Sequence, residues 1–293
     1  MIWLLLSIFS SAAVALLLKA GSHHAVPRFP LFAVNYTVAL LLGLVIAQPG
    51  ALSREPRAAL AIALASGVLY VLGFVVFRRA IMETSTGIAA SVSRLSVTGP
   101  VLLSVIAFGE LVAPLQGVGL VLAVLVLPLS GASWPPWRGS GRPGSSTTGA
   151  HSHGAAAGVL WSVALFLIFA VNDGVLKVRT GLFRGSDAGF FFAVLFGAAG
   201  VACPVLAVVR RERFVPGVLL GVPLGAANYG TAFFLSRALE RVPGYQAFTL
   251  NSVGVILLVV IAGRLIFGER LARHNYLFLA GSIVAIVLLR LPG

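Results

Sequence analysis

The sequence is poor in cysteine and in charged side chains, and both shortages restrict what the protein can be. Cys203 is the only cysteine, so the chain has no internal disulfide and no cysteine-based metal site. Charged residues make up 10% of the chain, whereas a soluble domain carries about 25%. The sequence also lacks the spacings typical of a zinc site, a phosphate-binding glycine loop or a catalytic nucleophile. We therefore expect no enzyme, no metal and no cofactor.

Long apolar runs take the place of these features. Apolar residues make up 59% of the 293 residues, and the mean hydropathy is +1.02. Because a membrane-spanning helix needs about 20 apolar residues, the runs predict an all-α integral membrane protein with ten transmembrane helices. The first run lacks the basic start of a signal peptide and is expected to be a mature helix. The expected spans are about 2–18, 30–48, 58–77, 86–107, 112–130, 155–177, 188–208, 216–236, 245–266 and 275–290.

The sequence repeats itself at an offset of 158 to 159 residues. Three groups of residues recur at this offset: two aromatic residues with an arginine, a Phe-Gly-Glu turn, and a Leu-Lys pair. These are Tyr70, Phe74 and Arg78 with Tyr229, Phe233 and Arg237, Phe108-Gly109-Glu110 with Phe267-Gly268-Glu269, and Leu18-Lys19 with Leu176-Lys177. Each copy holds five spans, so the second copy enters the membrane from the opposite side. The pattern predicts two inverted five-helix repeats, with a substrate site where they meet near the midplane.

The expected domain organisation is a first repeat over residues 1–130, a linker over 131–154 and a second repeat over 155–293. The linker is rich in Gly, Pro and Ser, which is typical of a flexible connection. The net charge of +13 comes from basic residues in short loops, which favours anionic membrane lipids over nucleic acid as partners. The same loop charges weakly favour an external N-terminus.

Two charged residues inside the predicted spans are the sharpest candidates for function. Arg94 lies well inside the fourth span and is interpreted as a binding residue for an anion or carboxylate. The alternative is a buried bridge to a partner group. Asp173 in the sixth span is interpreted as a proton-coupling carboxylate. The alternative for Asp173 is an ion pair with Lys177, four residues later, with Gly174 marking a loosened helix end.

Uncharged polar residues near the middle of the spans form a candidate cavity lining. As single residues they are also explained by hydrogen bonds between helices; as a set they favour a cavity. The set is Tyr70, Asn228, Tyr229, Asn251 and Ser252. Glu110 and Glu269 are interpreted as turn residues with solvated carboxylates.

Helix-packing signals accompany these polar residues. Gly217, Gly221 and Gly225 recur every four residues in the eighth span, which predicts close approach of a neighbouring helix. Gly99-Pro100 predicts a bend in the fourth span, because proline removes a backbone hydrogen bond.

At this point the chain resembles a known family. Two five-span halves, each with a fourth span that ends in Gly-Glu, and the stretch TLNSVGVILLVVIAGRLIFGERL from residue 249, are similar to EamA-type members of the drug/metabolite transporter superfamily. The resemblance implies a ten-helix carrier with a central cavity between the two repeats. It also implies cytoplasmic termini and a small-molecule substrate, since members export or exchange amino acids and other metabolites.

The residues and the resemblance together predict a secondary transporter, an exporter or exchanger of a small polar or anionic organic metabolite, working by alternating access. Its expected setting is a bacterial inner membrane, as a multi-pass monomer or homodimer with protons as the candidate coupling ion. One alternative is a proton-coupled exporter of cationic drugs, with Asp173 as the binding carboxylate. Another is a flippase for lipid-linked intermediates or a membrane scaffold without transport.

Overall fold

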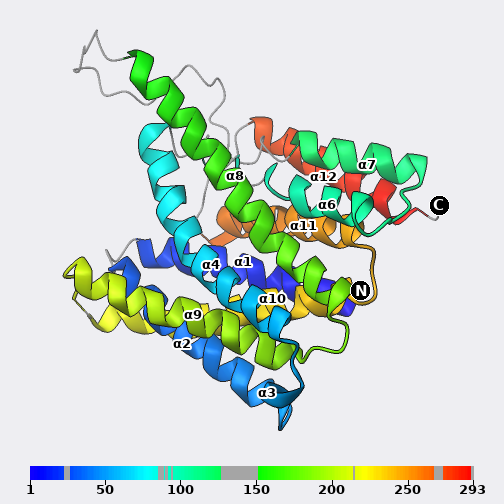
Figure 1. Cartoon of the computed structure of the whole chain (residues 1–293). Coiled ribbons are helices and arrows are strands. Elements are labelled where there is room, and N and C mark those ends of the chain that lie inside the picture. The colour runs from blue at the N-terminus through cyan, green and yellow to red at the C-terminus, as the bar shows by residue number, and fades with distance from the viewer. Residues whose placement is uncertain are drawn as a thin grey trace.

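The computed structural model describes residues 1–22, 27–84, 89, 92–93, 95–126, 151–213, 215–266 and 273–291. Within these ranges every regular element is a helix (Figure 1). In chain order they are α1 (Ile2–Ser22), α2 (Arg28–Ile46), α3 (Ala51–Arg54), α4 (Arg57–Glu83), α6 (Thr98–Ile106), α7 (Pro114–Val126), α8 (His151–Leu182), α9 (Ala188–Val209), η2 (Pro216–Leu220), α10 (Gly221–Leu239), α11 (Gly244–Ile266) and α12 (Arg273–Arg290).

Apart from the short α3 and η2, these elements correspond one by one to the ten predicted spans, which confirms the all-helical fold. Within the described ranges, six helices are long and apolar enough to cross a membrane, and three further apolar helices are shorter. The six are Phe29–Ile46, Arg57–Glu83, Ala157–Leu182, Ala188–Val209, Gly217–Leu239 and Gly244–Ile266; the shorter ones are Ile2–Leu18, Pro114–Val126 and Leu279–Leu289.

Large apolar side chains cover the outside of the bundle. Val45 is 82% exposed and Leu265 is 78% exposed, and similar residues occur on the outer faces of all the long helices. In water such a surface would drive association. In lipid it is the expected outer surface of a spanning helix, whose backbone hydrogen bonds are all made internally.

The two halves of the chain pack together with matching contacts. Three helices of the first half pack on their own repeat partners: α2 on α9, α6 on α11 and α7 on α12. The most extensive remaining contacts occur in related pairs: α1 packs on α10 as α8 packs on α4, α4 packs on α9 as α10 packs on α2, and α1 packs on α11 as α8 packs on α6. This pairing is what a two-fold axis between inverted repeats requires.

Glycines permit the close contact between α10 and α2. A Cβ atom added at Gly225 would lie 2.4 Å from the carbonyl oxygen of Asn35, and one at Gly221 would lie 2.7 Å from that of Leu31. These approaches confirm the prediction that this glycine series is a helix-packing surface. Gly217, the third member of the series, belongs to η2.

At each end of the α2–α9 pair, a carboxylate accepts a hydrogen bond from the backbone. Glu212, just after α9, accepts a hydrogen bond from the backbone N–H of Phe29 at the start of α2, at 3.0 Å. Glu55, just before α4, accepts one from the backbone N–H of Asp187, immediately before α9. The first N–H groups of a helix have no partner within the helix, so both contacts satisfy donors that would otherwise be unpaired.

Some local expectations differ from the structure. α8 continues through Gly174 to Leu182, so this glycine marks no helix end. α8 also begins at His151, which makes the last residues of the predicted linker helical. The bend expected at Gly99-Pro100 occurs just before it: a turn at Ser96 and Val97 precedes α6, whose first turn contains Pro100.

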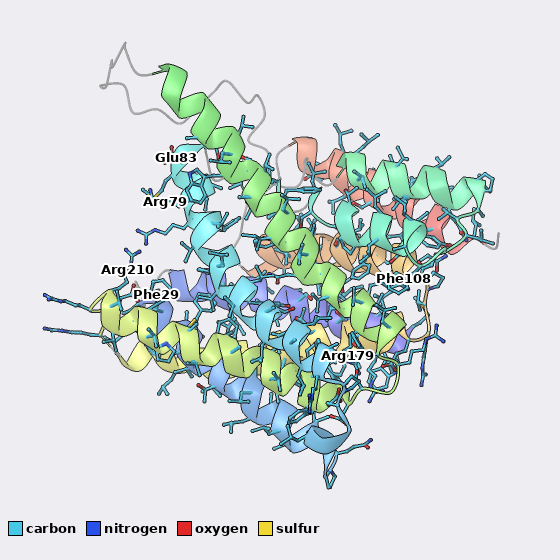
Figure 2. All side chains as sticks on the ribbon, viewed as in Figure 1. Phe29, Arg79, Glu83, Phe108, Arg179 and Arg210 are labelled. Atoms are coloured by element: carbon cyan, nitrogen blue, oxygen red, sulfur yellow. The ribbon has the colours of Figure 1, made fainter. Side chains whose placement is uncertain are left out.

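The helix directions define two ends of the molecule. The N-terminus, the end of α8 and the start of α11 lie at one end, called here the termini face, and the C-terminus lies on the same side (Figure 1). The start of α2 and the ends of α4 and α9 lie at the other, called the opposite face. Figure 2 shows the contrast, with Phe108 and Arg179 at the termini face and Phe29, Arg79 and Arg210 at the opposite face.

Replacing Gly225 by alanine should destabilise the fold, because the new methyl group would meet the backbone of α2. Overpacking of this kind costs about 1–3 kcal/mol. Gly117→Ala is the matched control, since its Cβ would meet only one side-chain carbon at 4.0 Å. Thermal unfolding in detergent should show a lower Tm for Gly225→Ala and no loss for Gly117→Ala. Equal Tm values would contradict the packing argument.

Candidate functional site: a charged cavity at the termini face

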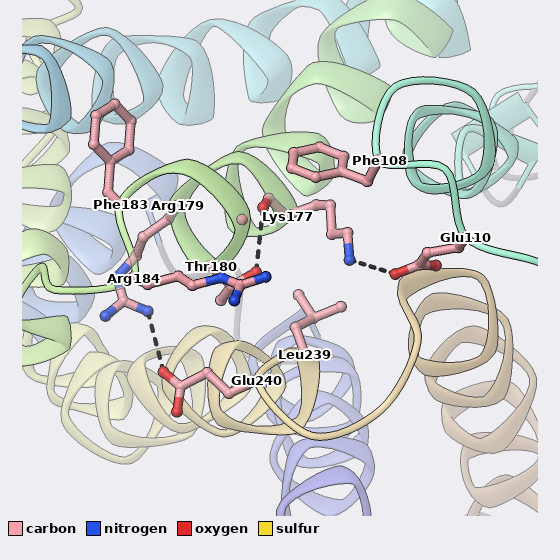
Figure 3. Close-up of a pocket in the computed structure, with 10 residues that line it drawn as sticks. Phe108, Glu110, Lys177, Arg179, Thr180, Phe183, Arg184, Leu239 and Glu240 are labelled. Atoms are coloured by element: carbon pink, nitrogen blue, oxygen red, sulfur yellow. Dashed lines mark hydrogen bonds and ion pairs between the residues drawn. The ribbon is translucent and has the colours of Figure 1, made fainter.

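A cavity of about 480 Å³ opens at the termini face between the ends of α6, α8 and α10 (Figure 3). Five charged side chains dominate its lining, together with polar and apolar groups of the same helices. The lining residues are Phe108, Glu110, Lys177, Arg179, Thr180, Gly181, Phe183, Arg184, Leu239 and Glu240. Three cations against two carboxylates leave the cavity positive.

One face of α8 supplies much of this lining. Lys177, Thr180 and Gly181 are spaced by three and four residues, so they share a side of the helix, and Arg184 lies in the turn that follows α8. Asp173 lies one turn deeper on the same side, about 6 Å along the axis. The other side carries exposed apolar residues such as Leu167 and Val171, at 53% and 50% exposure. α8 therefore turns a polar face inward and an apolar face outward.

Glu110 links three elements at the edge of the cavity. Gly109 has φ +64°, a left-handed conformation that ends the helical path of α6 and turns the chain. The Glu110 carboxylate then accepts hydrogen bonds from the first N–H groups of α11, at Gly244 (2.8 Å) and Tyr245 (3.1 Å). It also forms an ion pair with Lys177 of α8 (Figure 3). The three contacts hold α6, α8 and α11 together at this end.

These contacts correct two expectations. The Glu110 side chain is only 15% exposed, so its carboxylate is paired and largely buried, not solvated. The ion pair between Asp173 and Lys177 was also wrong, because Lys177 turns toward the cavity and binds Glu110 instead. Its ammonium group additionally lies 5.1 Å from the centre of the Phe108 ring, within the range of a cation–π contact.

Arg179 is a nearly buried guanidinium behind the cavity. It is 3% exposed and donates to the Ser236 hydroxyl at 2.5 Å and to the backbone oxygen of Ser186 at 3.0 Å. Glu240 lies 3.7 Å away as its carboxylate partner. A buried guanidinium with this many partners is held in one place. Arg179 therefore serves as a fixed positive charge that ties α8 to α10.

Arg184 differs from the other two cations. It is exposed at the cavity mouth and forms no hydrogen bond or ion pair with any residue in the described part of the chain. It also borders a smaller adjoining cavity of about 200 Å³ that Glu55, Asp187 and Arg237 line. Arg184 is thus a cation available to a ligand at the mouth of the cavity.

Glu55 titrates abnormally at the edge of the adjoining cavity. Burial raises the pKa of its carboxyl above the ordinary value, although the hydrogen bond from Asp187 and the charge of Arg179 act to lower that pKa. One carboxyl oxygen is buried without a hydrogen-bond partner among the described atoms. The protonated form is favoured at such an oxygen, because an unpaired buried charge is costly.

The two charged residues predicted as functional have different outcomes. Arg94 lies outside the described residues. Asp173 is half-buried on α8, and this helix packs on α4, which carries Tyr70. In the described part of the chain it forms no hydrogen bond or ion pair, so its carboxylate remains available for a proton or a cationic group.

The uncharged candidates occupy separate places. Tyr229 lies within an aromatic cluster, with ring centres 6.2 Å from Phe192 and 5.6 Å from Phe233, and its buried hydroxyl has no partner among the described atoms. Asn228 donates to Asn35 of α2 at 3.4 Å. That these residues line one cavity stays a prediction.

α11 carries the last two candidates. Asn251 accepts a hydrogen bond from Ser7 of α1 at 3.0 Å, which is a contact between helices of the kind weighed as the alternative. Ser252 is half-buried on the same helix. Tyr70 of α4 shares a neighbour with Tyr229: their ring centres lie 6.1 Å and 6.2 Å from that of Phe196.

The charged cavity itself was missed from the sequence. Lys177, Arg179 and Arg184 had been assigned to loop topology, and Glu110 to a turn. A signal was present, because the Leu-Lys pair and the Phe-Gly-Glu turn both recur in the repeat. Two polar residues that recur together among apolar spans indicate a structural partnership, and the ion pair between Lys177 and Glu110 is that partnership.

The helical bundle with its charged cavity defines a multi-pass membrane protein. Residues 1–130 match the model of the EamA-like transporter family, so the first half of the chain is similar to members of that family. That family consists of transporters, and the match agrees with the sequence-based expectation of a transporter of small molecules and not an enzyme.

Two further comparisons cover the whole chain. An uncharacterized protein of Haemophilus influenzae is 25% identical over 301 residues, which span 97% of this chain and 95% of the relative. A solved crystal structure superimposes with a TM-score of 0.73 at 17% identity, over 99% of this chain and 96% of the other. The structural match shows that the fold extends through both halves.

Breaking the ion pair between Glu110 and Lys177 should destabilise the protein, because the two side chains are only 15% and 10% exposed. Removing one partner of a buried pair costs about 3–5 kcal/mol. In a double-mutant cycle of Glu110→Gln and Lys177→Met, thermal unfolding should give a double mutant less destabilised than the sum of the single mutants.

Arg237 and Glu240 supply the control cycle, with side chains 42% and 34% exposed at a separation of 3.2 Å. Exposed pairs contribute about 0–1 kcal/mol, so the Arg237→Met and Glu240→Gln cycle should show little coupling. Additive effects in the Glu110 and Lys177 cycle would show that the ion pair does not hold this end of the bundle together.

Proposed function

We propose that the protein is a secondary transporter of a small anionic or zwitterionic organic metabolite, acting by alternating access. The observation that carries the proposal is the positive cavity at the termini face, in which Arg184 is free to bind a ligand. A guanidinium pairs well with the carboxylate or phosphate group of a metabolite. The similarity of residues 1–130 to a transporter family supports the transport function, and the positive lining of the cavity supports a preference for an anionic group.

The residues of α8 between the cavity and the interior support a substrate site with one positive and one negative side chain. In the proposal Arg184 attracts the anionic group at the mouth, and Asp173, one turn deeper than Lys177 on α8, binds a proton or the amine of a zwitterion after the ligand has moved inward. Tyr70 on α4, which packs on α8, is proposed to contact the same ligand. Arg94, outside the described residues, remains a proposed binding residue, as do Asn228, Tyr229, Asn251 and Ser252.

The packing of the two halves supports alternating access. Related helices pack in related pairs, so rocking one half against the other would close the cavity at one face while opening the other. We propose a bacterial inner membrane as the setting, which the Haemophilus influenzae relative supports. In this proposal the transporter exports or exchanges its substrate as a monomer or homodimer, with protons as the coupling ion.

Exchange across reconstituted vesicles tests the proposal. Purified protein is reconstituted and assayed for uptake of labelled amino acids, carboxylic acids, sugar phosphates and lipophilic cations. Arg184→Gln should raise the half-saturating concentration of an anionic substrate about tenfold or more, because a hydrogen bond to a charged group contributes about 1.5–3 kcal/mol. Asp173→Asn should abolish the dependence of uptake on a pH gradient.

Arg57→Gln is the matched control, since Arg57 is exposed at the same face and lines neither cavity. It should transport like the wild type. Uptake of lipophilic cations alone, lost in Asp173→Asn and unchanged in Arg184→Gln, would overturn the proposal in favour of a cation exporter.

A further inference from the structure

The opposite face carries a second polar pocket that the proposed function does not use. It has a volume of about 250 Å³ and lies at the ends of α4 and α9. Arg78, Arg79 and Arg210 line it, together with the apolar side chains of Phe74 and Met82. Figure 2 shows Arg79, Arg210 and Phe29 gathered at this end of the bundle, far from Phe108 and Arg179.

The repeat relates this pocket to the termini face. Phe74 and Arg78 on α4 correspond to Phe233 and Arg237 on α10, and Arg237 borders the adjoining cavity beside Glu55. Glu212 takes the place of Glu55: each follows the second helix of its half. Glu212 accepts a hydrogen bond from the backbone N–H of Phe29 at the start of α2, as Glu55 accepts one from the backbone N–H immediately before α9. Corresponding parts of the two halves therefore build a polar pocket at each end of the α2–α9 pair.

The charges of the opposite-face pocket are unbalanced. Its three guanidinium groups are exposed and form no ion pair or hydrogen bond with any residue in the described part of the chain. The one carboxylate, Glu212, is already engaged by the backbone N–H of Phe29 at 3.0 Å. Three arginines close together repel one another, and an anion between them removes that repulsion. At the termini face, by contrast, Arg237 is paired with Glu240 at 3.2 Å.

We propose that this opposite-face pocket binds an anionic group, a phosphate or a carboxylate, carried on a partly apolar molecule. The guanidinium groups of Arg78, Arg79 and Arg210 bind the anion, since their planar forks match the oxygens of phosphate and carboxylate. Phe74 and Met82 contact the apolar part of the ligand. Such a ligand is either a soluble organic anion or the headgroup of an anionic lipid, because the pocket lies at the end of a candidate membrane span, where lipid headgroups and water meet.

Thermal stability of the purified protein in a non-ionic detergent at low salt tests the site. The probes are hexyl phosphate and, separately, mixed micelles that contain phosphatidylglycerol or phosphatidylcholine. Wild-type protein should gain stability with hexyl phosphate, with phosphatidylglycerol, or with both, because a ligand that binds only the folded state stabilises it. The double variant Arg78→Gln/Arg79→Gln should raise the apparent Kd at least tenfold, and Arg210→Gln should raise it in the same direction.

Two controls separate this site from other effects. Arg213→Gln removes the same charge from an exposed position near α9 that does not line the pocket, and it should bind like the wild type. Arg184→Gln removes the free cation of the termini-face cavity and should also leave this binding unchanged. Because no transport is measured, failure of the transport proposal would leave this result standing.

Each outcome decides the question. A response to hexyl phosphate that the arginine variants lose identifies a site for soluble anions. A response to phosphatidylglycerol alone, also lost in those variants, identifies a site for a lipid headgroup. A stability gain that persists in Arg78→Gln/Arg79→Gln and in Arg210→Gln, or no gain with either probe, would overturn the proposal.

Discussion

The antiparallel contact between α2 and α9 is the constraint on which the rest of the structure depends. A Cβ atom added at Gly43 would lie 2.8 Å from the backbone nitrogen of Ala193, and one at Gly189 would lie 2.6 Å from that of Ala47. Lipid tails provide no hydrophobic drive to bring helices together, so close backbone packing must supply the attraction. Glycine at these positions lets α2 and α9, one helix from each repeat, pack closely along their length. At each end of this contact a carboxylate accepts a hydrogen bond from the backbone.

This contact also determines where the charges at the termini face lie. α9 begins there with Phe191 and Phe192, and both rings lie 5.8 Å from the guanidinium carbon of Arg179. Held between these rings, Ser236 and Glu240, Arg179 cannot turn toward the cavity mouth. The next cation along the chain, Arg184 in the turn after α8, forms no hydrogen bond or ion pair among the described residues, and in the proposed function it is the cation that meets the ligand.

Much of the fold was predictable because its signals are local or repetitive. The lengths of the apolar runs predicted the ten helices, and the match of Tyr70 with Tyr229 in the repeat predicted how the two halves are related. The site was less predictable, since spacing along a helix says which residues can meet and not which do. Lys177 is four residues from Asp173, yet it binds Glu110, which is 67 residues away in sequence and is brought close by the turn at Gly109. Asn251 was predicted to line a cavity, and that stays a prediction; its hydrogen bond with Ser7, 244 positions away in sequence, could not be foreseen from helical spacing.

The repeat separates residues that build the fold from those that make the two ends chemically different. Phe74 and Phe233, Glu55 and Glu212, and Lys19 and Lys177 occur in both halves, and those described in the structure serve packing or helix ends. Asp173 and Arg184 have no counterpart: at the offset of 158 they fall on Ala15 and Val26. A symmetric scaffold with a symmetric lining would treat both directions of passage alike. In the proposed transport cycle, substrate preference and ion coupling therefore arise from the charges that only one half carries, because the repeated residues make the inward-open and outward-open states alike.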